Sequence, residues 1–182
     1  EMEKHNFSSP KITFRHASEV IGMGEQAAIS VRRKRDSSIV VGLDILKKGQ
    51  ADAFVSAGNT GAVVCAAVLS LRLLPGIERP GIAIVIPTLN GSSLMIDVGA
   101  NIAAKPMHLL QYGIMADAFS RFILGKSNPT VGLLSVGEEE SKGTEFVKET
   151  HTLLSESKLN FLGNIEGRDV YTGKTDIVLC DG

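Results

Sequence analysis

A short polar turn at residues 56–61 reads Ser-Ala-Gly-Asn-Thr-Gly and lies between two apolar runs. Its glycines would let a ligand approach the backbone closely. The first N–H groups of a following helix lack intrahelical partners and attract anions. We therefore interpret the turn as a phosphate cradle, although Asn59 or Thr60 capping the helix is a simpler alternative. The residues assigned to the cradle are Ser56, Gly58, Asn59, Thr60 and Gly61.

Four further turns combine glycine with Asn, Asp, Glu, Lys or Arg directly after an apolar run. They lie at residues 97–101, 137–143, 163–169 and 181–182. The carboxyl ends of parallel strands meet at one edge of a sheet, and ligands bind there. Five such turns in one chain predict one shared site.

Other motifs in the chain are weaker. Residues 22–27 match the dinucleotide fingerprint GxGxxA, with Asp44 about twenty residues further on. We reject this reading because the preceding segment is a poor strand and Asp44 falls inside an apolar helical run. The four histidines show no metal-ligand spacing, and neither a GxSxG elbow nor a Cys–His arrangement is recognisable. We expect no metal, no cofactor and no covalent enzyme intermediate.

A basic run occupies residues 32–35, Arg-Arg-Lys-Arg. Basic side chains are favourable at the carboxyl end of a helix, so the run can be an ordinary solvated helix end. It can instead be a docking patch for an acidic partner.

The elements that position these turns follow from apolar periodicity. Helices are predicted at residues 17–35, 39–48, 60–74, 106–124 and 144–156. Strands are predicted at residues 11–15, 53–55, 81–86, 94–98, 130–136, 161–162 and 177–180, with a hairpin at Asn90 and Gly91. The alternation predicts an α/β fold, a three-layer αβα architecture with a mainly parallel sheet. We expect residues 1–182 to form a single α/β domain. Because the last predicted strand has no helix after it, we expect an incomplete part of a longer chain.

Composition sets the broad class. The 182 residues are 43% hydrophobic and 21% charged, with a formal net charge of −1, so bulk charge does not favour nucleic-acid binding. Cys65 and Cys180 lie far apart, which favours a reduced, cytoplasmic setting. The longest apolar stretch, residues 62–74, is too short to span a bilayer.

The turns and their flanks resemble the bacterial phosphate acyltransferases, which transfer acyl groups from acyl carrier protein to phosphate. The matching pieces include "VSAGNTGA", "GIERPGIA", "DVGAN", "VGLLSVGEEESKGTEFVKE" and "GNIEGRD", and they cover nearly the whole chain in order. The chain departs from the family pattern at Ala103 and Met107, where the family commonly has Asp and Glu.

The resemblance implies a fold similar to isocitrate and isopropylmalate dehydrogenases and to phosphotransacetylases. It implies a cytoplasmic homodimer that can associate peripherally with the inner face of the membrane. The implied substrates are acyl carrier protein carrying a fatty acyl thioester and inorganic phosphate. The acyl phosphate product would supply a glycerol-3-phosphate acyltransferase in phospholipid synthesis. The apolar helices beginning at Thr60 and Pro106 also favour a homodimer.

For such a reaction, three residues are our catalytic candidates: Asn59, Asn101 and Lys142. Lys142 would neutralise phosphate, and Asn101 would donate to the oxyanion or bind phosphate. Glu139 and Asp97 are alternatives for orienting donors, and Arg168 either binds phosphate or pairs with Asp169. The remaining predicted substrate-binding residues are Lys105, Gly143, Asn164 and Asp181.

Two other functions remain open at this point. One is a phosphotransacetylase-like transfer from acyl-CoA to phosphate on the same fold. The other is a non-catalytic fragment that binds carrier protein or dimerises.

Overall fold

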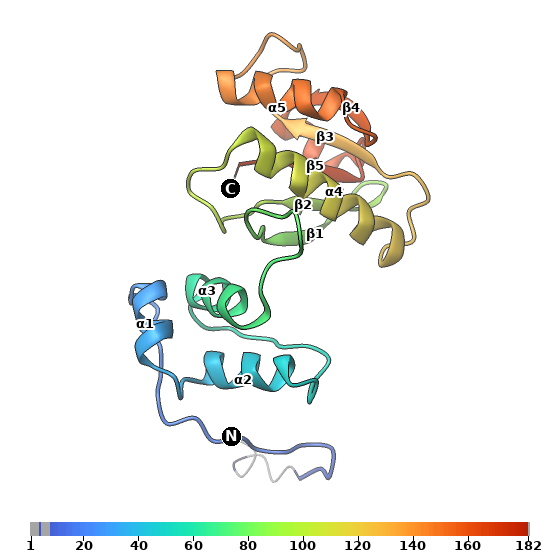
Figure 1. The fold of residues 1–182 in the computed structure, drawn as a ribbon. Helices are drawn as coiled ribbons and strands as arrows, with labels where there is room; N and C mark the ends of the chain where they lie inside the picture. Colours follow the sequence, from blue (N-terminus) through green and yellow to red (C-terminus); the bar gives the residue numbers. More distant parts are fainter. Residues whose placement is uncertain (1–3, 5–7, 182) are drawn as a thin grey trace. The chain divides into compact units, whose positions relative to one another are not determined.

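The computed structural model describes residue 4 and residues 8–181 (Figure 1). The chain divides into two compact units, Glu1–Arg72 and Leu73–Gly182, and each is described by itself. That residues 1–182 form a single domain stays a prediction.

The described residues of the first unit contain three helices: α1 (Ala27–Arg33), α2 (Ser38–Lys47) and α3 (Thr60–Leu71). Helix α3 packs against both others. At Gly61 the approach of α3 to α1 is close, because a Cβ there would lie 3.2 Å from the Cβ of Ala27. Their shared core consists of Ile21, Val31, Ile39, Leu43, Ala62 and Ala66.

Several elements predicted for this unit are wrong. Residues 11–15 and 53–55 are not strands, and of the predicted helix 17–35 only α1 forms. The described residues of the unit contain one isolated bridge, Glu19 to Ser37, and no sheet that a short strand could join. In the apolar run at 53–55, the ring of Phe54 instead packs against α2. The contact is close at Gly42, because a Cβ on that residue would lie 2.2 Å from Phe54 Cε2.

The second unit is built on a five-stranded sheet of order β1-β2-β5-β3-β4. The strands are β1 (Ala83–Thr88), β2 (Gly91–Ile96), β3 (Thr130–Leu134), β4 (Asn160–Ile165) and β5 (Ile177–Leu179). Strands β1 and β2 form an antiparallel hairpin, and the pairs β2–β5, β5–β3 and β3–β4 are parallel. The mainly parallel sheet and the hairpin around Asn90 and Gly91 are therefore confirmed.

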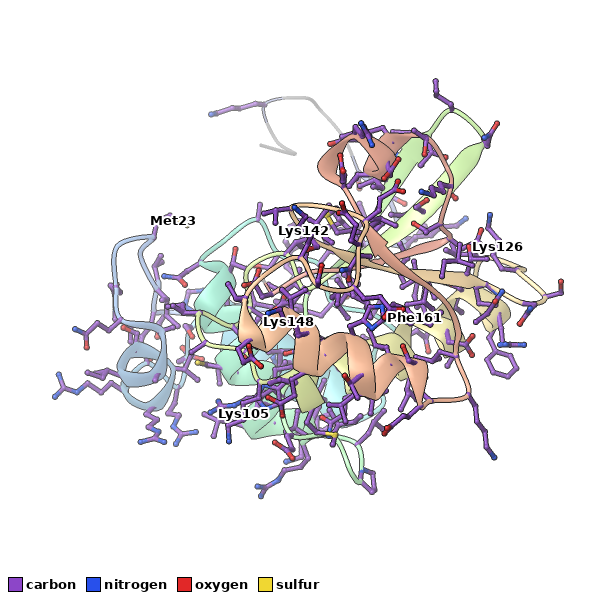
Figure 2. The ribbon with its side chains drawn as sticks, turned by 90° about the horizontal axis from the view of Figure 1, so that it is seen from above. Met23, Lys105, Lys126, Lys142, Lys148 and Phe161 are labelled. Atoms are coloured by element: carbon purple, nitrogen blue, oxygen red, sulfur yellow. The ribbon has the colours of Figure 1, made fainter. Side chains whose placement is uncertain are left out.

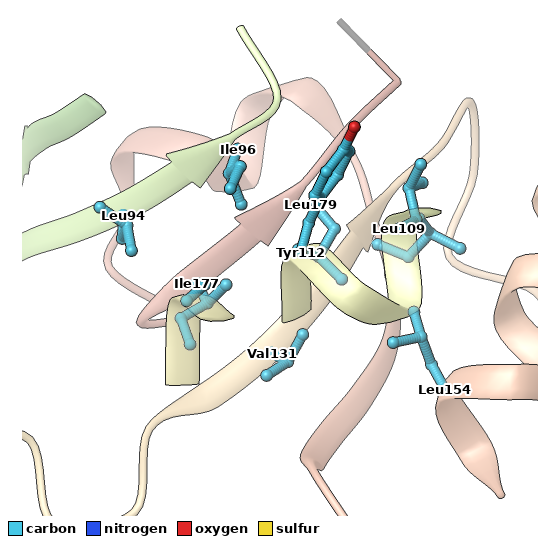
Figure 3. Close-up of a cluster of buried hydrophobic side chains, with 10 residues drawn as sticks. Leu94, Ile96, Leu109, Tyr112, Val131, Leu154, Ile177 and Leu179 are labelled. Atoms are coloured by element: carbon cyan, nitrogen blue, oxygen red, sulfur yellow. The ribbon is translucent and has the colours of Figure 1, made fainter. Parts of the chain in front are cut away.

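Two long helices cover one face of this sheet, α4 (Pro106–Phe122) and α5 (Glu145–Ser155). Both lie within two residues of their predicted bounds. Figure 3 shows the core they bury, which includes Leu94, Ile96, Leu109, Tyr112, Val131, Leu154, Ile177 and Leu179. The opposite face carries the short 3-10 helix η1 (Gly167–Tyr171) over a smaller cluster of Ile86, Ile165, Val170 and Val178.

Across the described residues, none of the helices combines the length and apolar character that crossing a membrane requires.

Candidate functional site

Four of the five predicted polar turns lie at one edge of the second unit's sheet. Strands β2, β5, β3 and β4 run parallel, so their carboxyl ends meet at this edge. We call it the carboxyl edge; the loops that begin there are residues 97–101, 135–143, 166–169 and 180–181. Ligands of parallel α/β proteins bind at this position.

The fifth turn, residues 56–61, lies in the first unit and follows no strand, contrary to prediction. Asn59 is the N-cap of α3 and is 7% exposed. Its Oδ1 accepts from the backbone N–H of Ala62 at 2.9 Å. Its Nδ2 contacts the carbonyl oxygens of Gly22, Met23 and Glu25 at 3.0, 3.2 and 3.3 Å. The simpler capping alternative therefore describes how Asn59 is used here.

The remaining cradle residues are more open. Thr60 and Gly61 are exposed at the start of α3. The Ser56 hydroxyl accepts from the backbone N–H of Gly58 at 3.1 Å. Their role in binding phosphate, and the sharing of one site with Lys142, stay predictions.

Asp97 organises the loop after β2. Its side chain is fully buried. Oδ1 accepts from the backbone N–H groups of Ile82 and Ala100 at 2.9 and 3.0 Å. Oδ2 accepts from the Asn101 backbone N–H at 3.0 Å and from Asn101 Nδ2 at 2.9 Å. The carboxylate thus fixes the loop around four donors.

The amide group of Asn101 is turned toward the protein. Besides Asp97, its Nδ2 contacts the Pro80 carbonyl oxygen at 2.7 Å and the Tyr112 hydroxyl at 2.8 Å. Burial and the charge of Asp97 raise the pKa of Tyr112 to about 12. An amide nitrogen carries only two hydrogens. In this arrangement Asn101 therefore has no N–H left for an oxyanion, and it holds the loop instead.

Lys142 lies in the loop between β3 and α5, and it is labelled in Figure 2. Gly137 lies beneath its stem, because a Cβ there would be 3.0 Å from Lys142 Cγ and 2.9 Å from Glu139 Oε2. The Lys142 side chain is exposed, and within residues 8–181 no carboxylate pairs with its ammonium group. An unpaired cation at this edge can attract an anionic ligand.

The start of α5 faces the same loop. Gly143 has φ +93°, and a Cβ on it would lie 2.8 Å from Val147 Cβ and 3.1 Å from Ser135 Oγ. Only glycine satisfies both the conformation and the space. Thr144 is the N-cap but its side chain makes no capping bond, so it leaves the first-turn N–H groups to other partners.

Other predicted residues support the loops. Asn164 donates from Nδ2 to the Glu139 carbonyl oxygen at 3.0 Å and holds the β3–α5 loop. Arg168 pairs with Glu166 at 3.3 Å and not with Asp169, so that alternative is wrong. The reason is that Asp169 turns back to accept from the Glu166 backbone N–H at 3.0 Å.

Sequence reasoning missed the polar contacts that anchor the start of α4. The backbone N–H of Lys105 donates to His108 Nδ1 at 3.1 Å, so Nε2 carries the proton and faces Glu78 Oε2 at 3.2 Å. His108 is 3% exposed. Its place three residues after Lys105, a capping-box spacing, was the available signal. The Lys105 side chain itself is exposed.

A pocket of about 340 Å³ opens at the carboxyl ends of β3 and β5, against α4 and α5. It was not predicted, apart from Gly143 and Asp181 at its rim. The first unit has its own hollow of about 880 Å³ beside α2, with Arg15, Arg35, Lys47 and Lys48 among its lining residues. In the described residues, no group of three or more His, Cys, Asp or Glu side chains is arranged to hold a metal ion.

Comparison with known proteins finds curated relatives that match the whole chain. The chain is 49% identical over 182 residues to a phosphate acyltransferase of Geotalea uraniireducens, covering 100% of this chain and 53% of that protein. It is 48% identical over 184 residues to a phosphate acyltransferase of Halothermothrix orenii, covering 100% of this chain and 55% of that protein. The chain thus spans about half the length of these curated relatives.

The fold is similar to that of a solved structure, the EutD phosphotransacetylase from Staphylococcus aureus. The TM-score is 0.62 at 20% sequence identity, covering 97% of this chain and 64% of that one. At this identity the likeness concerns the fold alone. The family described as "Fatty acid synthesis protein" matches residues 1–182, the whole chain, and the protein therefore belongs to that family.

Proposed function

We propose that the protein is a phosphate acyltransferase that moves a fatty acyl group from acyl carrier protein to inorganic phosphate. A phosphate oxygen would form the bond to the acyl carbon while the carbon–sulfur bond breaks. The carrier's sulfur would leave as a thiolate and take up the proton that the attacking hydrogen phosphate loses. The products are an acyl phosphate and the free carrier thiol.

The observation that carries the proposal is Lys142 at the carboxyl edge, ahead of α5, which is exposed and has no carboxylate partner among residues 8–181. Phosphate is a dianion at neutral pH, so holding it beside a carbonyl requires positive charge. Lys142 would supply that charge, and the first-turn N–H groups of α5 would add to it. The identity to proteins named phosphate acyltransferase supports the same reaction.

The other residues would hold the loops and the Lys142 side chain in place. Asp97 and Asn101 would keep the loop after β2 in place. Glu139, beside Lys142 over Gly137, would fix the lysine stem. Phosphate is already ionised and needs no strong general base, so direct attack suffices. Gly143, Asn164 and Asp181 line or support the same edge and would complete the substrate site, with Lys105 and Arg168 as outer contacts.

We further propose the wider setting that such a reaction implies. The acidic carrier protein would dock on the basic first unit, and a glycerol-3-phosphate acyltransferase would consume the acyl phosphate. The protein would be a cytoplasmic homodimer, with peripheral association at the membrane and the three-layer fold of the isocitrate dehydrogenases. Exposed apolar side chains on α4, among them Ile114, Phe119 and Phe122, support a dimer through that helix.

The test is mass spectrometry of the products formed from palmitoyl carrier protein and phosphate. Acyl phosphate should appear with the wild type and should fall strongly with Lys142→Ala. Lys158→Ala, an exposed lysine between α5 and β4, is the matched control and should behave as wild type. Preference for palmitoyl-CoA over the carrier thioester would assign the phosphotransacetylase-like reaction. Carrier binding without thioester consumption would make the protein a binding fragment.

A further inference from the structure

The pocket at the carboxyl ends of β3 and β5 has an apolar interior. Leu109 of α4 and Leu133 of β3 line it and are each 1% exposed. Phe146 and Val147, in the first turns of α5, line it as well and pack against the same core. Water inside such a pocket finds few hydrogen-bond partners, so an apolar ligand can replace it favourably.

The rim of the pocket is polar. Gly143, Thr144 and Asp181 lie along it, and Lys142 directly precedes Gly143. Ser135 also lines the pocket, and its Oγ is buried without a hydrogen-bond partner in the described residues. An apolar interior beside a lysine that no described carboxylate pairs with matches a ligand with an alkyl chain and an anionic head.

We propose that this pocket holds the carbonyl-proximal part of the fatty acyl chain, with the phosphate on the Lys142 side of the rim. The inference rests on the proposed function and adds where the acyl group lies. A methylene group is about as large as a water molecule, whose share of liquid volume is about 30 Å³, so the pocket holds on the order of ten chain carbons. Longer chains extend beyond it through its open side.

Stable alkyl phosphates of increasing chain length, from hexyl to hexadecyl, are the probe. Their binding to the 182-residue chain is measured by calorimetry. Affinity should rise about fourfold for each enclosed methylene and level off after on the order of ten carbons. Inorganic phosphate alone gives the baseline contribution of the head group.

Two substitutions of Val147 change the pocket in opposite directions. Val147→Met should fill it, weaken the longer alkyl phosphates at least tenfold and move the plateau to shorter chains. Val147→Ala should enlarge it and move the plateau to longer chains. Leu153→Met changes the same helix outside the pocket and should leave the series unchanged. Circular dichroism verifies folding, and Val147→Ala decides the question if Val147→Met does not fold.

Two results would overturn the inference: affinity independent of chain length, or a plateau that neither Val147 substitution moves. The proposed function fails in a different way. In that case the chain-length series and its response to Val147 stay intact, while no acyl phosphate forms from carrier thioester and phosphate.

Discussion

Asn101 donates twice to one oxygen of Asp97, from its backbone N–H at 3.0 Å and from its side-chain Nδ2 at 2.9 Å. The second Asp97 oxygen accepts from Ile82 and Ala100. One buried carboxylate thereby joins the end of β2, the segment before β1 and the loop toward α4. The loop at this part of the carboxyl edge is held from inside the protein.

Asp97→Asn should destabilise the protein by about 2–4 kcal/mol, because a side-chain NH2 would replace an oxygen that now accepts from buried donors. The free energy of unfolding in urea measures the effect. Asp181→Asn, at an exposed carboxylate of the same edge, is the control and should change stability little. Unchanged unfolding in Asp97→Asn would show that the buried carboxylate is not the hub of the loop.

Asn59→Ala should cost about 2 kcal/mol of stability, because it removes the α3 cap and the donors to three carbonyl groups. Asn59→Asp keeps the cap but places a carboxylate oxygen against three carbonyl oxygens, so its loss of stability should be at least as large as that of Asn59→Ala. Thr60→Ala, at the adjacent exposed position, should change little. If Asn59 instead binds phosphate, Asn59→Ala would leave unfolding unchanged and raise the phosphate KM.

Local sequence signals predicted the second unit well. The apolar spacing of α4 and α5 and the Asn-Gly turn of the hairpin act over a few residues, so the sequence displays them directly. The three residues at 53–55 carry the composition of a strand, but a strand also needs a neighbour to pair with. The described part of the first unit supplies none, and composition could not reveal that.

In the candidate site, too, the sequence predicted the features that neighbouring residues determine and missed those that distant residues determine. The turn "DVGAN" marked Asp97 and Asn101 from their types alone, but their partners Pro80, Ile82 and Tyr112 lie 11 to 21 residues away in sequence. Whether an amide faces a ligand or the protein depends on those distant partners. The sequence therefore located the loop but not the use of its side chains.

Stability at low pH should depend on Glu25, which bonds to Lys34, to the Gly22 backbone N–H and to Ser30. The hydrogen bonds from Lys34, Gly22 and Ser30, in that order, lower the pKa of Glu25 to about 2 against an ordinary 4.5. Because the pKa of Glu25 is lower in the folded protein than in the unfolded chain, its ionised carboxylate stabilises the folded state at pH values above the unfolded pKa. This stabilisation is lost as the pH falls from about 4.5 to about 2.

The stability difference between wild type and Glu25→Gln should accordingly be largest above pH 4.5 and shrink toward pH 2. Urea unfolding at a series of pH values measures it, with Asp52→Asn as an exposed control in the same unit. A difference that stays constant across this range would contradict the assignment.

The basic run should govern the rate of carrier docking. Lys34 is used internally, since it pairs with Glu25 at 2.6 Å, whereas Arg32, Arg33 and Arg35 are exposed. The first unit carries ten Lys or Arg against seven Asp or Glu, a formal charge of +3. Replacing the three arginines by Ser should slow association with acidic carrier protein and flatten its salt dependence. Stopped-flow binding at two salt concentrations measures this, and an unchanged rate at low salt would make the run an ordinary helix end.

Lys142→Ala should raise the phosphate KM about tenfold, roughly 1.4 kcal/mol, and leave the free energy of unfolding unchanged. The effect on phosphate follows from the loss of an unpaired cation at the carboxyl edge. Exposure limits its size, because solvent screens the charge. Stability should persist because no carboxylate in the described residues depends on this ammonium group.

Lys174→Ala is the contrasting variant. Lys174 pairs at 2.8 Å with Glu138, which lies in the same loop as Lys142, and that hydrogen bond is the main cause of the raised pKa of Lys174. Its removal should loosen the loop slightly without changing the phosphate KM as strongly. Equal phosphate KM values for Lys142→Ala and wild type, in steady-state assays with saturating acyl carrier thioester, would remove Lys142 from the phosphate site.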